Sequence, residues 1–209
     1  KAMRIANPIA ENTSYFASSR VFDIEDSLGV ELAWNYGVNA THCFKIFDRE
    51  ATFNADAYRT QFENQVVIDI EDPTKLRFYN LDGESYSNSI QFDFNYELFE
   101  RFDMKLAYKI NQVYSTFDGE KKIMPLVPEN RALVNFAYST DHINKWLFDA
   151  TWNYVGESRI PRHESIDAEY SDPFSLINCQ VTKKVNNFDF YIGAENLLSY
   201  TQENPILDY

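Results

Sequence analysis

Few residue combinations in this chain could carry out catalysis. Ser139, Asp141 and His142 contain a nucleophile, an acid and a base, but they fall in or beside one tight turn, where nothing orients the imidazole. His42 and His163 have no partners at the spacing of metal ligands, nor does His142. The sequence therefore predicts no active site and no cofactor, and we expect that the protein is not an enzyme.

An acidic run near the N-terminus offers oxygen ligands to a hard cation. Asp23, Glu25 and Asp26 could together hold Ca²⁺, but neighbouring carboxylates of this kind more often form a solvated loop. The formal net charge of -13 argues against a nucleic-acid partner, because phosphate binding needs a basic patch. We therefore expect neither a metal site nor a nucleic-acid partner.

The elements that carry these residues are predicted to be strands. In residues 188–195, Phe188, Phe190 and Ile192 fall on one face, and polar residues alternate with them. The polar face of such segments carries Asn, Asp, Thr, Gln and Lys, and the apolar face carries Trp, Phe and Tyr near its ends. The same alternation returns around residues 34–45, 51–58, 90–97, 103–111, 132–138, 146–154 and 177–182. The strand after residue 51 is expected to run on into residues 65–70, with a bulge near residues 58–62.

Short and long connections alternate between these strands. Tight turns are expected at residues 47–50, 99–102, 141–144 and 184–187, whereas the connection at residues 156–173 is long and polar. A membrane barrel sorts its turns in this way, and a soluble sandwich with Greek-key crossovers does not. A large soluble antiparallel sheet with one wet face would also alternate, so the residues favour a membrane barrel without excluding that alternative.

The two cysteines give little additional information. Cys43 and Cys179 lie on strands far apart in the sequence, so a disulfide framework is not expected. We expect thiols that are buried or face lipid. No apolar run approaches the roughly 18 residues of a transmembrane helix.

Five segments resemble, in order, motifs of TonB-dependent outer-membrane receptors. Residues 125–131 resemble Pro-x-x-Pro-x-His/Asn-Arg/Lys, and residues 193–198 resemble Gly-x-Glu-Asn-Leu-Phe/Leu. The segment at residues 30–39 keeps the Glu and Gly of its motif, although Leu-Gly-Val precedes it where Leu-Lys-Pro is commoner. Residues 58–66 and 79–89 resemble two further barrel-strand motifs.

This resemblance implies an all-β fold, an antiparallel up-and-down meander of about nine strands from a transmembrane β-barrel of about 22. Residues 1–209 would be a partial barrel domain that lacks the plug domain, the TonB box and the closing strand. An open, strongly curved sheet is expected, or edges covered by another chain. The resemblance also implies the outer membrane of a Gram-negative bacterium, contact with its lipid, and TonB acting through N-terminal regions outside this chain.

The resemblance further implies uptake of a small molecule, such as a ferric siderophore, that external loops capture. Arginine and aromatic residues suit an anionic or ring-containing ligand, although the same residues could simply pack on neighbouring loops. The candidates in the first and last long loops are Tyr15, Phe16, Arg20, Arg159, Arg162 and His163. The alternative function is a soluble or surface β-sheet module that binds a glycan or a protein.

Overall fold

The computed structural model describes residues 1–13, 19–140, 143–161 and 168–202, and almost all of its elements are strands. One short helix, α1 (Pro8–Glu11), begins at the cap Asn7, whose side chain accepts a hydrogen bond from the Ala10 amide at 3.2 Å. The strands are β1 (Ala2–Ile5), β2 (Val21–Ile24), β3 (Val30–Ile46), β4 (Arg49–Asn64), β5 (Val66–Asp69), β6 (Lys75–Asn80), β7 (Ser85–Phe99), β8 (Phe102–Phe117), β9 (Glu120–Ile123), β10 (Asn130–Ser139), β11 (Trp146–Val155), β12 (Phe174–Val185) and β13 (Phe188–Ala194).

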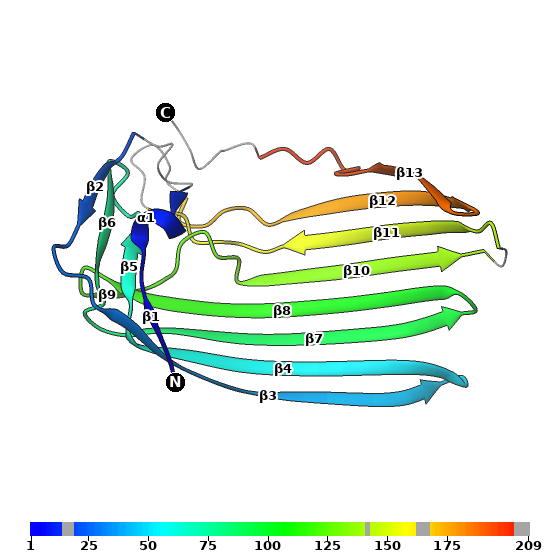
Figure 1. Ribbon diagram of the computed structural model, residues 1–209, viewed down its shortest axis with the longest axis horizontal. Coiled ribbons are helices and arrows are strands. Elements are labelled where there is room, and N and C mark those ends of the chain that lie inside the picture. Colours follow the sequence, from blue (N-terminus) through cyan, green and yellow to red (C-terminus); the bar gives the residue numbers. More distant parts are fainter. Residues whose placement is uncertain (14–18, 141–142, 162–167, 203–209) are drawn as a thin grey trace.

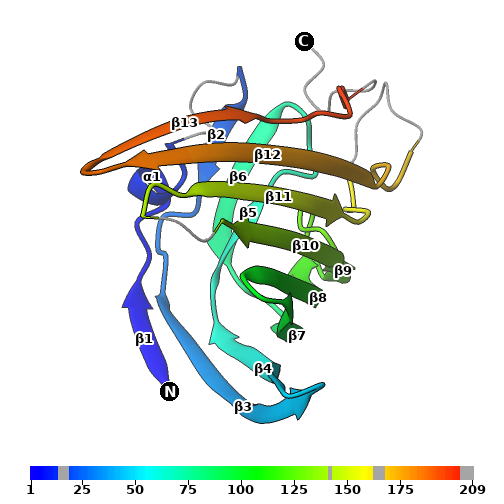
Figure 2. The ribbon, with the colours of Figure 1, turned by 90° about the vertical axis from the view of Figure 1, so that its right-hand side faces the viewer.

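Most of these strands form one antiparallel sheet in which neighbours in sequence are neighbours in space. Its order is β1, β3, β4, β7, β8, β10, β11, β12 and β13, and β9 pairs with β8. Figure 2 shows this sheet curving into an open trough, with β3 and β13 on its two sides. Within the described residues no pairing joins β1 to β13, so the trough stays open. The predicted all-β meander is confirmed.

The tight turns lie together at one end of the trough (Figure 1). Phe47 and Asp48, which join β3 to β4, have φ angles of 47° and 64°. Positive φ at both central residues suits a two-residue hairpin, because its twist then matches that of the strands. Arg101 and Asn186 have φ angles of 63° and 52° in two further predicted turns. The turn expected at residues 141–144 lies partly outside the described residues.

The registers separate polar from apolar side chains over most of the sheet. One row, on the concave face, contains Thr52, Asn95, Lys105, Asn135, Thr151 and Asn178. The neighbouring row, on the convex face, contains Phe53, Phe94, Leu106, Val134, Trp152 and Ile177. Phe92, Trp146 and Phe148 on this convex face remain 40%, 44% and 43% exposed. The described residues place no second layer over them.

The core is small and lies at the end opposite the tight turns. Val66, Ile70, Leu76 and Phe78 form a buried cluster, and three strands contribute to a second sheet there, in the order β2, β6, β5. β5 runs antiparallel to β6, and β2 runs parallel to it. The long-loop end therefore has a compact structure of its own.

The second sheet corrects the expected continuation of the strand after residue 51 into residues 65–70. β4 ends at Asn64, and the Val66 amide donates to the Glu31 carboxylate at 3.1 Å instead of joining β3. The Asn64 side-chain amide donates to the Val30 carbonyl at 2.8 Å. These bonds turn the chain out of the large sheet. The register shifts between Leu32, which pairs with Asn64, and Ala33, which pairs with Phe62, so the bulged residue is Glu63, directly after the predicted range.

Both cysteines are free, as expected, but they face different environments. Cys179 pairs with Ala150 and Ala194 in an apolar row. Cys43 is exposed, and its Sγ lies 3.8 Å from Thr52 Oγ1 in the polar row, so it is neither buried nor on the apolar face. Among the described elements, α1 has four residues and no helix could cross a membrane.

Candidate functional site

The concave face of the sheet is mostly polar, although Ala107, Leu133 and Leu176 also fall on it. Neighbouring strands bond across it through side chains: Asn39 donates to Asp56 at 2.6 Å, and Asn35 donates to Thr60 at 2.9 Å. On β10, the Asn135 amide reaches Thr151 Oγ1 at 2.8 Å. Strand alternation places every second side chain on this face. This face therefore carries mainly amides, hydroxyls and carboxylates, which water can solvate.

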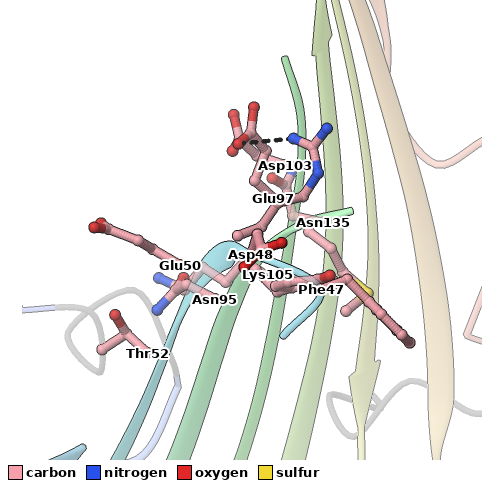
Figure 3. A pocket seen from close by; sticks show the side chains of 12 residues that line it. Phe47, Asp48, Glu50, Thr52, Asn95, Glu97, Asp103, Lys105 and Asn135 are labelled. Carbon is pink, nitrogen blue, oxygen red and sulfur yellow. Dashed lines mark ion pairs between the residues drawn. The ribbon is translucent and has the colours of Figure 1, made fainter. Parts of the chain in front are cut away.

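A hollow in this face lies at the tight-turn end and has a volume of about 800 Å³. Thr52, Asn95 and Asn135 line it, and Figure 3 shows the ion pair inside it, where Arg49 Nη1 lies 3.1 Å from Glu97 Oε2. Acidic side chains outnumber basic ones in its lining, which includes Asp48, Arg49, Glu50, Glu97, Asp103 and Lys105. The hollow is therefore polar and weakly acidic, and its lining residues do not form a catalytic constellation.

A buried arginine ties three connections together at the opposite end. The Arg159 guanidinium, 9% exposed, makes two hydrogen bonds to the Glu71 carboxylate, one of them at 3.1 Å. Its Nε donates to the Ile123 carbonyl at 2.6 Å, and its carbonyl accepts from the Leu126 amide at 2.9 Å. Arg159 therefore fixes the β5–β6 turn, the end of β9 and the β11–β12 connection to one another.

A second arginine collects carboxylates on the small sheet. Arg77 Nη1 lies 2.7 Å from Asp118 and 3.6 Å from the buried Asp69, and its Nε lies 3.7 Å from Asp23. The hydrogen bond that Arg77 donates to the Asp118 carboxylate raises the pKa of the guanidinium. Sequence reasoning missed this residue, although a cation that alternates with apolar residues in a strand is a recognisable signal.

The tyrosine beside this group is strongly perturbed. Burial, and then the charge of Asp69, raise the pKa of the Tyr79 hydroxyl, which donates to Asp69 at 3.1 Å. The hydroxyl also accepts from the Asp118 amide at 3.3 Å. Tyr79 therefore stays neutral at physiological pH and holds the small sheet against the β8–β9 turn.

Comparison with known proteins decides what this trough is. The sequence pattern described as "TonB dependent receptor-like, beta-barrel" matches residues 6–197. The chain belongs to the family of TonB-dependent receptor β-barrels. None of the curated proteins matches it.

A solved structure has a similar fold. The ferric-catecholate import receptor Fiu from Escherichia coli K12, in its closed form, superposes with a TM-score of 0.56 and 15% identity. The match covers 83% of this chain and 24% of Fiu, so the chain spans about a quarter of that receptor's length. The resemblance seen in the sequence is confirmed, and the family is one of receptors and transporters rather than enzymes.

The TonB-dependent receptor barrel brings two of the predicted ligand residues to one turn. Arg159 binds Glu71, and Arg20 is close enough to Asp72 to contribute, after hydrogen bonds from Thr74, to lowering the pKa of that carboxyl. Both arginines thus approach the β5–β6 turn of the receptor. Their contact with a ligand stays a prediction.

The remaining predicted ligand residues cannot be placed on this receptor surface. Tyr15, Phe16, Arg162 and His163 lie outside the described residues. The same is true of Asp141 and His142 from the hypothetical catalytic set.

The acidic run considered for calcium has other partners in the receptor. Glu25 accepts from the Asn80 backbone amide at 2.8 Å and from its side chain at 2.7 Å, and Asp23 faces Arg77. In the ranges that the structure describes, no group of three or more His, Cys, Asp or Glu could hold a metal ion.

Proposed function

We propose that residues 1–209 form part of the barrel of a Gram-negative outer-membrane receptor, which takes up a scarce nutrient such as a ferric siderophore using TonB-derived energy. The barrel contacts outer-membrane lipid through its convex face. The TonB complex acts through N-terminal regions outside this chain. The ligand is a small molecule, with an iron chelate as the first candidate, and no nucleic acid is involved.

The observation that carries this proposal is the separation of the two faces. Phe92 and Trp146 stay exposed on the convex face. On the concave face, amide, hydroxyl and carboxylate side chains of neighbouring strands form hydrogen bonds with one another. A soluble sheet would cover its apolar face, whereas a barrel strand in a bilayer points apolar side chains outward and polar ones into the lumen. The open edges of the trough leave room for the rest of a closed barrel.

The small sheet and its arginines support capture of an anionic ligand at the long-loop end. Arg20 is half-buried at the start of β2, where the Val21 amide donates to the Thr74 carbonyl at 2.8 Å. The core of Val66, Leu76 and Phe78 gives this position a rigid support. Arginine recognises carboxylates and other oxyanions through paired hydrogen bonds. The neighbour Fiu imports ferric catecholates, which places such chelates first among the ligands to test.

The test uses the receptor carrying Arg20→Ala together with Arg162→Ala. Each hydrogen bond to a charged group contributes about 1.5–3 kcal/mol, so we expect at least a tenfold weaker binding of ferric catecholate and slower iron uptake. Lys122→Ala is the matched control, because Lys122 is a partly exposed cation paired with Glu120 on β9. Unchanged binding in the double variant would remove these residues from the ligand site.

Loss of TonB tests the energy source separately. Uptake should stop in cells without TonB while surface binding persists. A protein that remains monodisperse without detergent would instead favour the soluble or surface binding module.

A further inference from the structure

The apolar band on the convex face ends abruptly at one row. On three adjacent strands the outward-facing series changes from Ala57, Ile90 and Ile110 to Arg59, Asn88 and Gln112. Arg59 pairs with Asn88, and Asn88 pairs with Gln112, so the change falls at one level on these three strands. This level lies toward the long-loop end.

An arginine at this level is held in a fixed orientation by neutral groups. Arg59 Nη1 donates to Asn88 and Nη2 donates to Gln61, both at 2.9 Å, and the guanidinium lies 4.3 Å from the centre of the Tyr86 ring. A guanidinium has five N–H donors, so several remain available. Arg59 forms no ion pair with any residue that the structure describes, although the chain carries a net charge of -13.

A lysine completes the cluster on the same aromatic ring. Lys121 Nζ lies 4.6 Å from the centre of Tyr86 and 5.7 Å from that of Tyr114. It also bonds to Glu84 at 2.9 Å, but both side chains are well exposed. The cluster therefore contains two cations, Arg59 and Lys121, and one carboxylate, Glu84, and it faces outward just beyond the apolar band.

We propose that Arg59 and Lys121, with Tyr86 between them, bind the phosphate of an anionic lipid headgroup in the external leaflet. This proposal rests on the proposed function, which places the convex face in a bilayer. Lipid phosphates lie at the level where a hydrocarbon-facing band ends. Basic side chains at that level attract anionic lipids, and the preoriented guanidinium can add charge-assisted hydrogen bonds.

The opposite end of the convex face provides a matched control. Lys183 lies 4.7 Å from the centre of the Trp146 ring, and its Nζ donates to the Asn144 carbonyl at 2.8 Å. It is a cation on an aromatic ring at the tight-turn end. The proposal assigns it no part in binding the external-leaflet headgroup.

The experiment measures lipid binding by native mass spectrometry of the detergent-purified receptor, titrated with phosphatidic acid or with phosphatidylcholine. The wild type should prefer phosphatidic acid. Arg59→Gln should weaken that binding about tenfold, whereas Lys183→Gln should leave it unchanged. Glu84→Gln frees Lys121 and should tighten it several-fold, which tests the site in a direction that misfolding cannot imitate.

Several outcomes would overturn the lipid site. They are equal binding of the two lipids by a membrane-inserted receptor, equal losses for Arg59→Gln and Lys183→Gln, or no change for Glu84→Gln. Inorganic phosphate that displaces phosphatidic acid at equal concentration would overturn the assignment to a lipid headgroup. A receptor recovered outside the membrane fraction would instead refute the proposed function on which the lipid site rests.

Discussion

Replacing Glu71 with Gln should loosen the long-loop end without unfolding the large sheet. The variant replaces the carboxylate that receives two hydrogen bonds from Arg159 with a neutral amide, whose single oxygen can accept only one of them. The guanidinium then has no opposite charge beside it, although it still donates to the Ile123 carbonyl at 2.6 Å. The side chains of Arg159 and Glu71 are 9% and 19% exposed, so water screens the pair poorly. An unpaired charge in such a place is costly.

The magnitude follows from this burial. Breaking a buried ion pair by removing one partner costs about 3–5 kcal/mol. Because Glu71 is partly exposed, we take the lower value of about 3 kcal/mol, which is roughly a 150-fold change in a local opening equilibrium. Hydrogen exchange reports such local opening directly. The amides to follow are those of Leu126, which bonds to the Arg159 carbonyl, and Ile160, which bonds to Glu169.

Two further variants separate this explanation from a general loss of stability. Glu120→Gln removes a 72% exposed carboxylate from its pair with Lys122 and should leave exchange at Leu126 unchanged. Glu71→Met combined with Arg159→Met replaces both charges with apolar groups, and it should restore most of the protection. If Leu126 exchanges at the wild-type rate in Glu71→Gln, the ion pair does not hold these connections together.

Three further perturbations test other parts of the structure. Burial raises the pKa of Tyr79, so the stability that its neutral hydroxyl contributes is complete below about pH 10 and is lost as the pH rises through the raised pKa. Alkaline titration followed by circular dichroism should show this loss of structure. The Tyr79→Phe variant should not show it. Phe78→Ala, at a position 1% exposed, should destabilise the small sheet by about 3–5 kcal/mol in local hydrogen exchange. Gly37→Ala should lower the temperature at which the barrel unfolds on a gel, because its Cβ would lie 2.6 Å from the Ala57 carbonyl oxygen, whereas Gly193→Ala, with 3.2 Å to its nearest atom, should have a smaller effect.

Each of these three predictions has its own contrary result. Alkaline unfolding that is identical in Tyr79→Phe would show that Tyr79 does not control it. Wild-type exchange in Phe78→Ala would mean that the cluster is not a cooperative core. Equal unfolding temperatures for the Gly37 and Gly193 variants would show that the close approach of β3 to β4 does not make a Cβ at position 37 destabilising.

Sequence patterns predicted the large sheet because its signals are local. Alternation around Ile90 and Phe92 requires only the period of a strand, and the turns at Phe47 and Arg101 require only a few residues that adopt positive φ. The face of the sheet on which a side chain lies follows from whether its position along the strand is odd or even. Each of these features can be predicted from the sequence of a single strand, without knowing which strands lie beside it.

The small sheet and the ion pairs could not be read in this way. Alternation predicts that Val66 lies in a strand, but it does not say which sheet contains that strand, and the deciding bond is to Glu31, 35 residues earlier. Arg159 is a predicted ligand residue because it lies in a polar loop, but the sequence gives no sign of its partner Glu71, which is 88 residues away. Side chains so far apart in the sequence meet only when the fold brings several loops together. Their pairing therefore leaves no periodic pattern in the sequence.

The native cysteines allow the most direct test of the central claim, that the convex face meets hydrocarbon and the concave face meets water. A nitroxide attached to Cys179 in a Cys43→Ser receptor, and one attached to Cys43 in a Cys179→Ser receptor, report on the two faces after reconstitution in a bilayer. Collision with oxygen should dominate at Cys179, and collision with a water-soluble nickel chelate should dominate at Cys43. Equal access of the nickel chelate to both positions would contradict the account.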